Sequence, residues 1–144
     1  SCKIKSRIVE LDEKEKNLRM ILNFGHTFAH AFESANNYSK NLNHGEAVIL
    51  GISAAIKFAY SKKIMSLNEL KLIQNHIQKL KLPHDIKKYF KKNQIKKIIE
   101  FMKSDKKNIS NKINLILIKK IGKKPAVLGF KANEIKDFLI KKFN

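Results

Sequence analysis

The stretch RMILNFGHTFAHAFESANNYSKNLNHGEAVILG, residues 19–51, contains three of the chain's five histidines and three of its five glycines. In one continuous helix, Arg19, Asn23, His26 and His30 would recur at i, i+4, i+7 and i+11. Side chains with that spacing share one helix face. The sequence therefore predicts a face that presents two imidazoles beside an arginine and an asparagine.

A second helix is predicted to follow after the polar segment 34–43. The first helix should run from Leu18 to Asn36, and His44 should open the second, which we expect to reach Lys62. The second helix is apolar almost all round, as is typical of a buried central helix. A histidine at the positive end of a helix tends to be neutral, which is the form that binds a metal.

Two histidines at i, i+4 more often form a satisfied polar stripe than a metal site, and the pattern is not HExxH. Two observations favour a metal. Three imidazoles from two helices would make a plausible half-site, since catalytic zinc usually has three protein ligands. A glycine inside a helix costs about 1 kcal/mol relative to alanine, so Gly25 indicates close approach of a backbone or a ligand. Glu46 fits the role of an acidic first-turn residue better than that of a partner to a metal ligand.

The chain has the size and composition of one globular domain. It has 144 residues, of which 43% are hydrophobic, enough to bury a core without disulfides. With Cys2 as the single cysteine, no disulfide framework is possible, and we expect a reducing, cytoplasmic location. No apolar run has membrane-spanning length. The start, SCKIKSR, reads as the middle of a helix, so we expect a C-terminal piece of a longer protein.

The net charge of +19 lies almost wholly in the second half of the chain. Residues 1–60 carry a net charge of +2, and residues 61–144 carry +17. The chain has 29 lysines and only two arginines, whereas bidentate recognition of phosphates and bases favours arginine. Lys, Asn and Ile make up 63 of the residues, and all three have AT-rich codons. An AT-rich genome therefore explains the excess of lysine at least as well as a nucleic-acid partner does. We therefore expect no nucleic-acid partner.

The remaining pattern predicts a mainly α fold with at most one short β-hairpin near residues 112–130. The segment INLILIK has the β-branched content of a strand. Ser66-Leu67-Asn68-Glu69 has the pattern of a capping box that opens a helix to about Leu80. Short helices are expected at 86–90 and 94–103, and Asn133 is expected to cap the last helix.

The motifs LNFGHTFAHAFE and HGEAVILGI resemble the metal-binding core of the 3-dehydroquinate synthase family. The resemblance continues upstream to Lys5 and Arg19, and downstream to Asp105-Lys106-Lys107. It is strong over the first sixty residues and looser beyond them. One departure is Ala29, where the family usually has glycine; we expect this small change to be tolerated.

The resemblance implies a lyase of the shikimate pathway and aromatic amino-acid biosynthesis. Such enzymes convert 3-deoxy-D-arabino-heptulosonate 7-phosphate to 3-dehydroquinate and phosphate, using NAD and a divalent metal, zinc or another such as cobalt. It further implies that residues 1–144 form one metal- and substrate-binding domain. An NAD-binding α/β domain, which this chain lacks, would precede it, and the full enzyme would be a homodimer. Alone, the chain is expected to be inactive.

By matching position, the resemblance assigns roles to eight residues, one of which is either Lys106 or Lys107. His26 and His44 would be metal ligands, and His30 would support proton transfer at the reacting centre. The third metal ligand, a glutamate, would lie on the upstream domain. The substrate phosphate and carboxylate would be held by Lys5, Arg19, Asn23 and one lysine of the pair Lys106 and Lys107. Glu15 would support them by orienting Arg19.

Four alternatives stay open. 2-Deoxy-scyllo-inosose synthases share this core, and metal-dependent alcohol and glycerol dehydrogenases share the fold with a less similar histidine context. A basic helical nucleic-acid-binding domain fits the charge but leaves the histidine face unexplained. The fourth alternative is a non-catalytic remnant that keeps only the fold.

Overall fold

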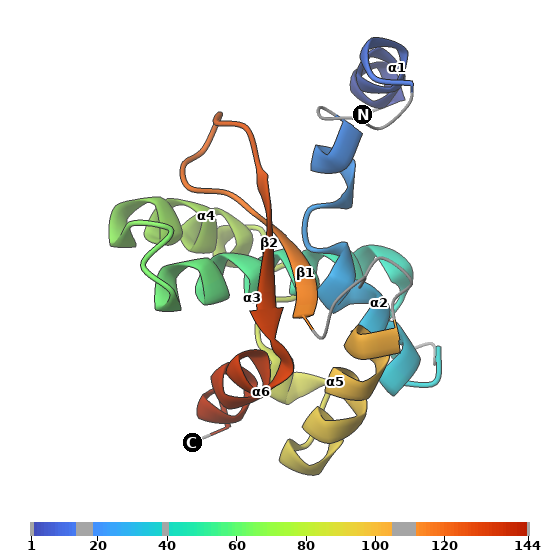
Figure 1. Cartoon of the computed structure of the whole chain (residues 1–144), viewed down its shortest axis with the longest axis vertical. Coiled ribbons are helices and arrows are strands. Elements are labelled where there is room, and N and C mark those ends of the chain that lie inside the picture. Colours follow the sequence, from blue (N-terminus) through green and yellow to red (C-terminus); the bar gives the residue numbers. More distant parts are fainter. Residues whose placement is uncertain (1, 14–18, 39–40, 105–111, 144) are drawn as a thin grey trace.

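The computed structural model describes residues 2–13, 19–38, 41–104 and 112–143. The described part is mainly helical and has one antiparallel hairpin (Figure 1). The order of elements is α1 (Cys2–Leu11), a 3-10 helix η1 (Arg19–Asn23), α2 (His26–Ala35), α3 (His44–Ser61), α4 (Leu67–Lys79), 3-10 helices η2 (Ile86–Lys88) and η3 (Lys92–Gln94), α5 (Ile95–Ser104), β1 (Lys112–Leu117), β2 (Ala126–Lys131) and α6 (Ala132–Lys141).

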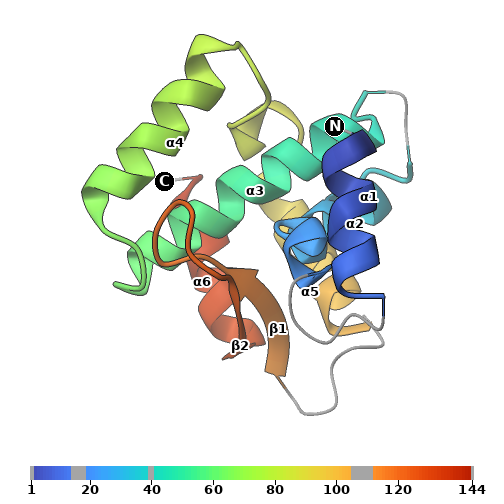
Figure 2. The same cartoon turned by 90° about the horizontal axis from the view of Figure 1, so that it is seen from above.

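Helix α3 runs through the middle of the molecule, as its sequence predicted. Figure 2 shows α4 on one side of α3 and α2 on the other. Half of the eighteen residues of α3 are buried, most of them alanines or larger apolar residues. Small side chains allow neighbouring elements to approach closely, so α2, α4, β1 and α6 all contact this helix.

The hairpin closes one side of the core. Strand β1 buries Ile113, Leu115 and Leu117 on one face, which is the alternation expected of a half-buried strand. It pairs with β2 from Lys112 opposite Lys131 to Leu117 opposite Ala126. The prediction of one hairpin near residues 112–130 is therefore confirmed.

Aromatic rings join the hairpin and α6 to α3. The Phe58 ring of α3 lies edge-on to Phe130 at 4.9 Å and to Phe138 at 5.1 Å between centroids. Edge-to-face pairs at such distances are favourable beyond the area they bury. These contacts fix the C-terminal third against the helix that carries His44.

The continuous helix expected over Leu18–Asn36 is wrong. Residues 19–23 form a 3-10 helix, and α2 begins only at His26. Between them Gly25 has φ +80°, a left-handed conformation that breaks an α-helix. A Cβ on Gly25 would lie 2.6 Å from the backbone nitrogen of Ile52 in α3. Gly25 thus allows the close backbone approach that was expected of it. It does so between two helices, η1 and α2, and not inside one continuous helix.

Two expected caps differ from the structure. Ser66 caps α4 by accepting from Glu69 N–H at 3.3 Å, but the Glu69 carboxylate accepts instead from Ile121 N–H at 2.9 Å. The cap position of α6 is Lys131 rather than Asn133, which lies inside the helix. At the start of α6 the Glu134 carboxylate accepts from Lys131 N–H at 2.9 Å. In both helices an acidic side chain therefore accepts from a backbone N–H that was not expected from the sequence.

Within the described ranges, no helix combines the length and apolar character needed to cross a membrane.

Candidate metal and substrate site

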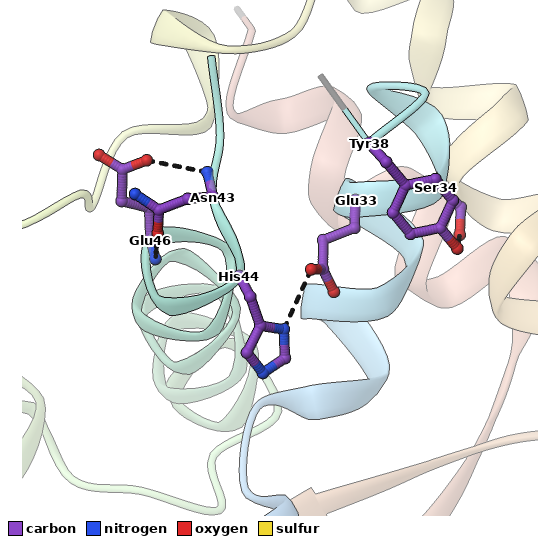
Figure 3. A network of polar contacts seen from close by, with 6 residues as sticks. All are labelled: Glu33, Ser34, Tyr38, Asn43, His44 and Glu46. Atoms are coloured by element: carbon purple, nitrogen blue, oxygen red, sulfur yellow. Dashed lines mark hydrogen bonds and ion pairs between the residues drawn. The ribbon is translucent and has the colours of Figure 1, made fainter. Parts of the chain in front are cut away.

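The site begins with two helix N-termini that lie side by side. His26 is the first residue of α2 and His44 is the first residue of α3. Asn43 caps α3: its side-chain oxygen accepts from Glu46 N–H at 3.0 Å, and the Glu46 carboxylate accepts from Asn43 N–H at 2.9 Å (Figure 3). This reciprocal pair is a capping box, so the backbone that carries His44 is held firmly. The first-turn role expected for Glu46 fits this contact.

Three histidine rings gather at this point. The His26 ring centroid lies 5.5 Å from that of His30 and 6.1 Å from that of His44. The first two are one turn apart on α2, and the third comes from α3. The structure thus brings together the three histidines that the sequence singled out, while their roles stay a prediction.

The surroundings of His26 favour its neutral form. Burial lowers its pKa below the usual 6.5, and the neighbouring His30 and His44 lower it further. A contact with the Phe24 carbonyl and the charge of Glu33 act in the opposite direction without reversing the shift. Neutral imidazole is the form that binds a metal ion, so His26 is ready for that role at neutral pH.

The ring contacts leave one nitrogen of each candidate ligand for a metal. Nδ1 of His26 lies 3.4 Å from the Phe24 carbonyl oxygen, and Nδ1 of His44 lies 3.0 Å from Glu33 Oε1. Both partners are acceptors, so each ring can present Nε2 as the ligand atom. Among the described residues no group of three or more His, Cys, Asp or Glu side chains is arranged to hold a metal ion. His26 and His44 alone thus offer two imidazoles, one fewer than the three protein ligands typical of catalytic zinc.

Arg19, an expected substrate residue, does not share a helix with the histidines. Arg19 lies in η1, where its backbone N–H donates to Asp12 and its guanidinium donates to the Glu13 carbonyl at 3.0 Å. The spacing argument that put Arg19 and Asn23 on the face of His26 fails with the helix break at Gly25. Arg19 is held by Asp12 and the Glu13 carbonyl, which directly follow α1.

The other expected residues divide into two groups. Lys5 is exposed on α1, and Asn23 is partly buried in η1. Glu15, Lys106 and Lys107 lie outside the described residues.

A hollow of about 320 Å³ adjoins His30, between α2 and α5. Its wall includes hydroxyl groups that the sequence argument did not single out, among them Ser34 and Tyr38, whose oxygens are 3.0 Å apart. Ser34 lies one turn beyond His30, so the helical period could have indicated it. Tyr38 follows the end of α2 at φ +52°, which no local pattern signals.

Comparison with known proteins supports the motif resemblance. The sequence profile described as 3-dehydroquinate synthase C-terminal matches residues 1–108. The chain belongs to this family. It is 51% identical over 141 residues to the 3-dehydroquinate synthase of Pelagibacter ubique (strain HTCC1062), and 45% identical over 124 residues to that of Endomicrobium trichonymphae. These alignments cover 98% and 85% of this chain, but only 38% and 33% of the relatives, so the chain spans about a third of their length.

Solved structures share the fold of this domain family. A 2-deoxy-scyllo-inosose synthase complexed with carbaglucose-6-phosphate, NAD+ and Co2+ superposes with a TM-score of 0.69 at 23% identity, over 88% of this chain and 35% of its own. ValA, a 2-epi-5-epi-valiolone synthase from Streptomyces hygroscopicus subsp. jinggangensis 5008 with NAD+ and Zn2+ bound, gives 0.69 at 20% identity, over 95% and 36%. At such low identity these likenesses show the fold alone.

Proposed function

We propose that this chain is the metal- and substrate-binding domain of a 3-dehydroquinate synthase, a phosphate-eliminating lyase of aromatic amino-acid biosynthesis. The whole enzyme would convert 3-deoxy-D-arabino-heptulosonate 7-phosphate to 3-dehydroquinate and phosphate. The observation that carries the proposal is the meeting of His26, His30 and His44 at two adjoining helix starts, in a chain of this family.

The metal would be held by His26 and His44 of this chain. Both rings have Nδ1 directed to an oxygen acceptor, and burial favours neutral His26. A divalent metal such as zinc or cobalt supplies Lewis-acid stabilisation of charge on a substrate oxygen, and NAD supplies reversible hydride transfer. With two imidazoles alone the site lacks the third ligand typical of catalytic zinc. We propose that a glutamate on an upstream NAD-binding α/β domain completes it, in a cytoplasmic homodimer.

The remaining residues would bind and protonate the substrate. His30 lines the polar hollow beside the cluster, where a proton could be exchanged with a bound hydroxyl. Lys5, Arg19, Asn23 and one lysine of the pair Lys106 and Lys107 would hold phosphate and carboxylate by charge-assisted hydrogen bonds. Arg19 would have to turn from the Glu13 carbonyl toward the substrate.

A related sugar-phosphate cyclase is the second candidate, because the superposed solved structures are of that kind. The identities of 51% and 45% to 3-dehydroquinate synthases favour the first candidate over cyclases at 23% and 20%. A phosphate-release assay with the heptulosonate phosphate and with glucose 6-phosphate separates the two.

The test measures zinc content by atomic absorption beside phosphate release. The isolated chain should show no turnover with zinc and NAD, and supplying the upstream domain should give both tight zinc binding and activity. In that complete form, His26→Ala should lose zinc and rate together, while Arg19→Ala should keep zinc and raise KM. His76→Ala, an exposed histidine on α4, is the control and should change neither quantity. Turnover by the isolated chain, or a His26→Ala form that keeps its zinc and its rate, would contradict the proposal.

A further inference from the structure

The carboxylate of Glu33 meets the ring of His44 across the gap between α2 and α3. Glu33 Oε1 lies 3.0 Å from His44 Nδ1 (Figure 3). Glu33 follows His26 and His30 at i+7 and i+3, so the three side chains lie on one face of α2. That face is directed at the first turn of α3, where His44 is held.

The contact favours hydrogen on Nδ1 of His44 over hydrogen on Nε2. An ionised carboxylate is only an acceptor, so the hydrogen between the two atoms belongs to Nδ1. In the neutral ring Nε2 then keeps its lone pair. His26 has a weaker arrangement of the same kind, because its Nδ1 faces the Phe24 carbonyl at the longer distance of 3.4 Å.

Exposure shows which side chain positions the other. The His44 side chain is 64% exposed, whereas that of Glu33 is only 13% exposed. An exposed imidazole has several rotamers of similar energy, so an anchored partner is needed to select one. Glu46 is held in the cap of α3, where its carboxylate accepts from Asn43 N–H, and the carboxylate that lies against the His44 ring is that of Glu33.

We propose that Glu33 is the positioning residue of His44: it holds the ring in the tautomer that leaves Nε2 bare for a metal ion. This inference rests on the proposed metal site and adds to it. A carboxylate behind a histidine ligand fixes the ring and makes it a stronger base, and loss of such a partner typically costs 10- to 100-fold in metal affinity. A negative charge beside two neutral imidazoles also favours binding of a dication.

The first experiment needs no metal and no substrate. Long-range proton–nitrogen NMR spectra of the metal-free chain at pH 8 report which nitrogen of His44 is protonated. The wild-type ring should carry its proton on Nδ1. Glu33→Ala should release the ring to a mixture containing the Nε2-protonated form. Glu33→Gln should retain the wild-type tautomer, because its amide oxygen still accepts.

The second experiment titrates zinc against a competing chelator in the complete form, with the upstream domain supplied, because the isolated chain has only two of the three ligands typical of catalytic zinc. Glu33→Ala should weaken zinc binding 10- to 100-fold, and Glu33→Gln should weaken it less, because only the charge is lost. Glu100→Ala removes the same charge from an exposed position on α5 and should leave affinity and tautomer unchanged. A merely structural role for Glu33 would not separate the alanine and glutamine variants in this way.

The outcomes keep this inference apart from the proposed function. An Nε2-protonated His44 in the wild-type chain, or a Glu33→Ala form with unchanged tautomer and unchanged zinc affinity, would overturn the positioning role. If the tautomer shifts in Glu33→Ala but no form binds zinc, the positioning role is supported and the metal site fails. If zinc binds equally to every form while the tautomer never changes, Glu33 has no such role even though the metal site stands.

Discussion

Gly25, which precedes α2, and Gly51 of α3 lie where the two helices approach each other closely. A Cβ on Gly51 would lie 2.4 Å from the Gly25 carbonyl oxygen, and one on Gly25 would lie 2.6 Å from Ile52 N. Ala29 is fully buried opposite Gly51, at 3.2 Å from where that Cβ would be. The Ala29 methyl group fits at this contact because Gly51, which faces it from α3, has no side chain. The distance between the two helix starts, and so between His26 and His44, depends on these glycines.

Replacing Gly25 by alanine should therefore destabilise the domain by about 3 kcal/mol. Left-handed backbone costs a residue with a Cβ roughly 1–2 kcal/mol, and overpacking adds about 1–3 kcal/mol. The measurement is urea denaturation followed by circular dichroism. Gly122→Ala is the matched control: its φ is +75°, but nothing lies within 4 Å of the added Cβ. It should lose only about 1 kcal/mol. Equal losses in the two variants would contradict the role given to helix contact.

Glu134 gives a pH-dependent contribution to stability. Its carboxylate binds the Lys62 ammonium and accepts from Lys131 N–H at 2.9 Å, and the Lys62 contact is the main cause that lowers its pKa below 4.5. Because the folded state holds the charged form, the contribution is complete above pH 4.5 and is lost as pH falls through the lower folded pKa.

Glu134→Gln should accordingly make the urea midpoint depend less on pH below 4.5. At the acidic end of the range, where Glu134 of the wild type is also uncharged, the two midpoints should differ little. The measurement compares midpoints at several pH values between 3 and 7 for both proteins. Asp137→Asn, another acid of α6, serves as the control for a change of charge alone. A Glu134→Gln curve parallel to that of the wild type would show that these contacts do not lower the carboxyl pKa.

At the scale of elements, the capped start of α3 holds one side of the candidate site. Asn43→Ala removes the acceptor of Glu46 N–H and should cost about 1 kcal/mol of stability. It should also loosen the backbone at His44. Ser66→Ala removes the same kind of cap from α4 and should cost a similar amount. Only Asn43→Ala should broaden the His44 ring signals in NMR spectra; broadening in both, or in neither, would contradict the local effect.

The elements that the sequence predicted correctly are those whose own pattern determines them. The buried helix from His44 and the single hairpin are examples, since an all-round apolar helix and a β-branched run leave few alternatives. The break at Gly25 was missed, because one glycine inside an apolar helical period is also compatible with a continuous helix. Its cause is a contact with Ile52, which lies 27 residues away in the chain.

In the candidate site, too, the residues that were predicted correctly are those that a local sequence pattern indicates. The histidines were found because three imidazoles near two helix starts form an unusual pattern. Glu33 was missed although it shares the face of His26 and His30, because its partner is on another helix. Arg19 was expected on one continuous helix with His26, but it lies in η1 before the break at Gly25, and helical periodicity does not indicate its contacts with Asp12 and the Glu13 carbonyl.

For the whole molecule, α1 is the part least attached to the core. Figure 1 shows it apart from the other helices, and none of its residues, all of them described, is buried. Ile4 and Leu11, two members of its apolar stripe, are 67% and 68% exposed. A helix of ten residues is marginal in water unless tertiary packing supports it. In the isolated chain α1 is therefore expected to open independently of the rest.

Amide hydrogen exchange measured by mass spectrometry tests this expectation. In the isolated chain, α1 should exchange almost as fast as an unfolded peptide, while α2 and α3 should be the slowest segments. Helix α6 is the internal control: it also has ten residues, but Ile135, Phe138 and Leu139 are buried, so it should be protected. In the proposed enzyme, the upstream domain should cover the Ile4 and Leu11 stripe and slow exchange in α1 to the rate of α6. Equal protection of α1 and α6 in the isolated chain would show that α1 is already stable there, and that the exposed stripe needs no partner.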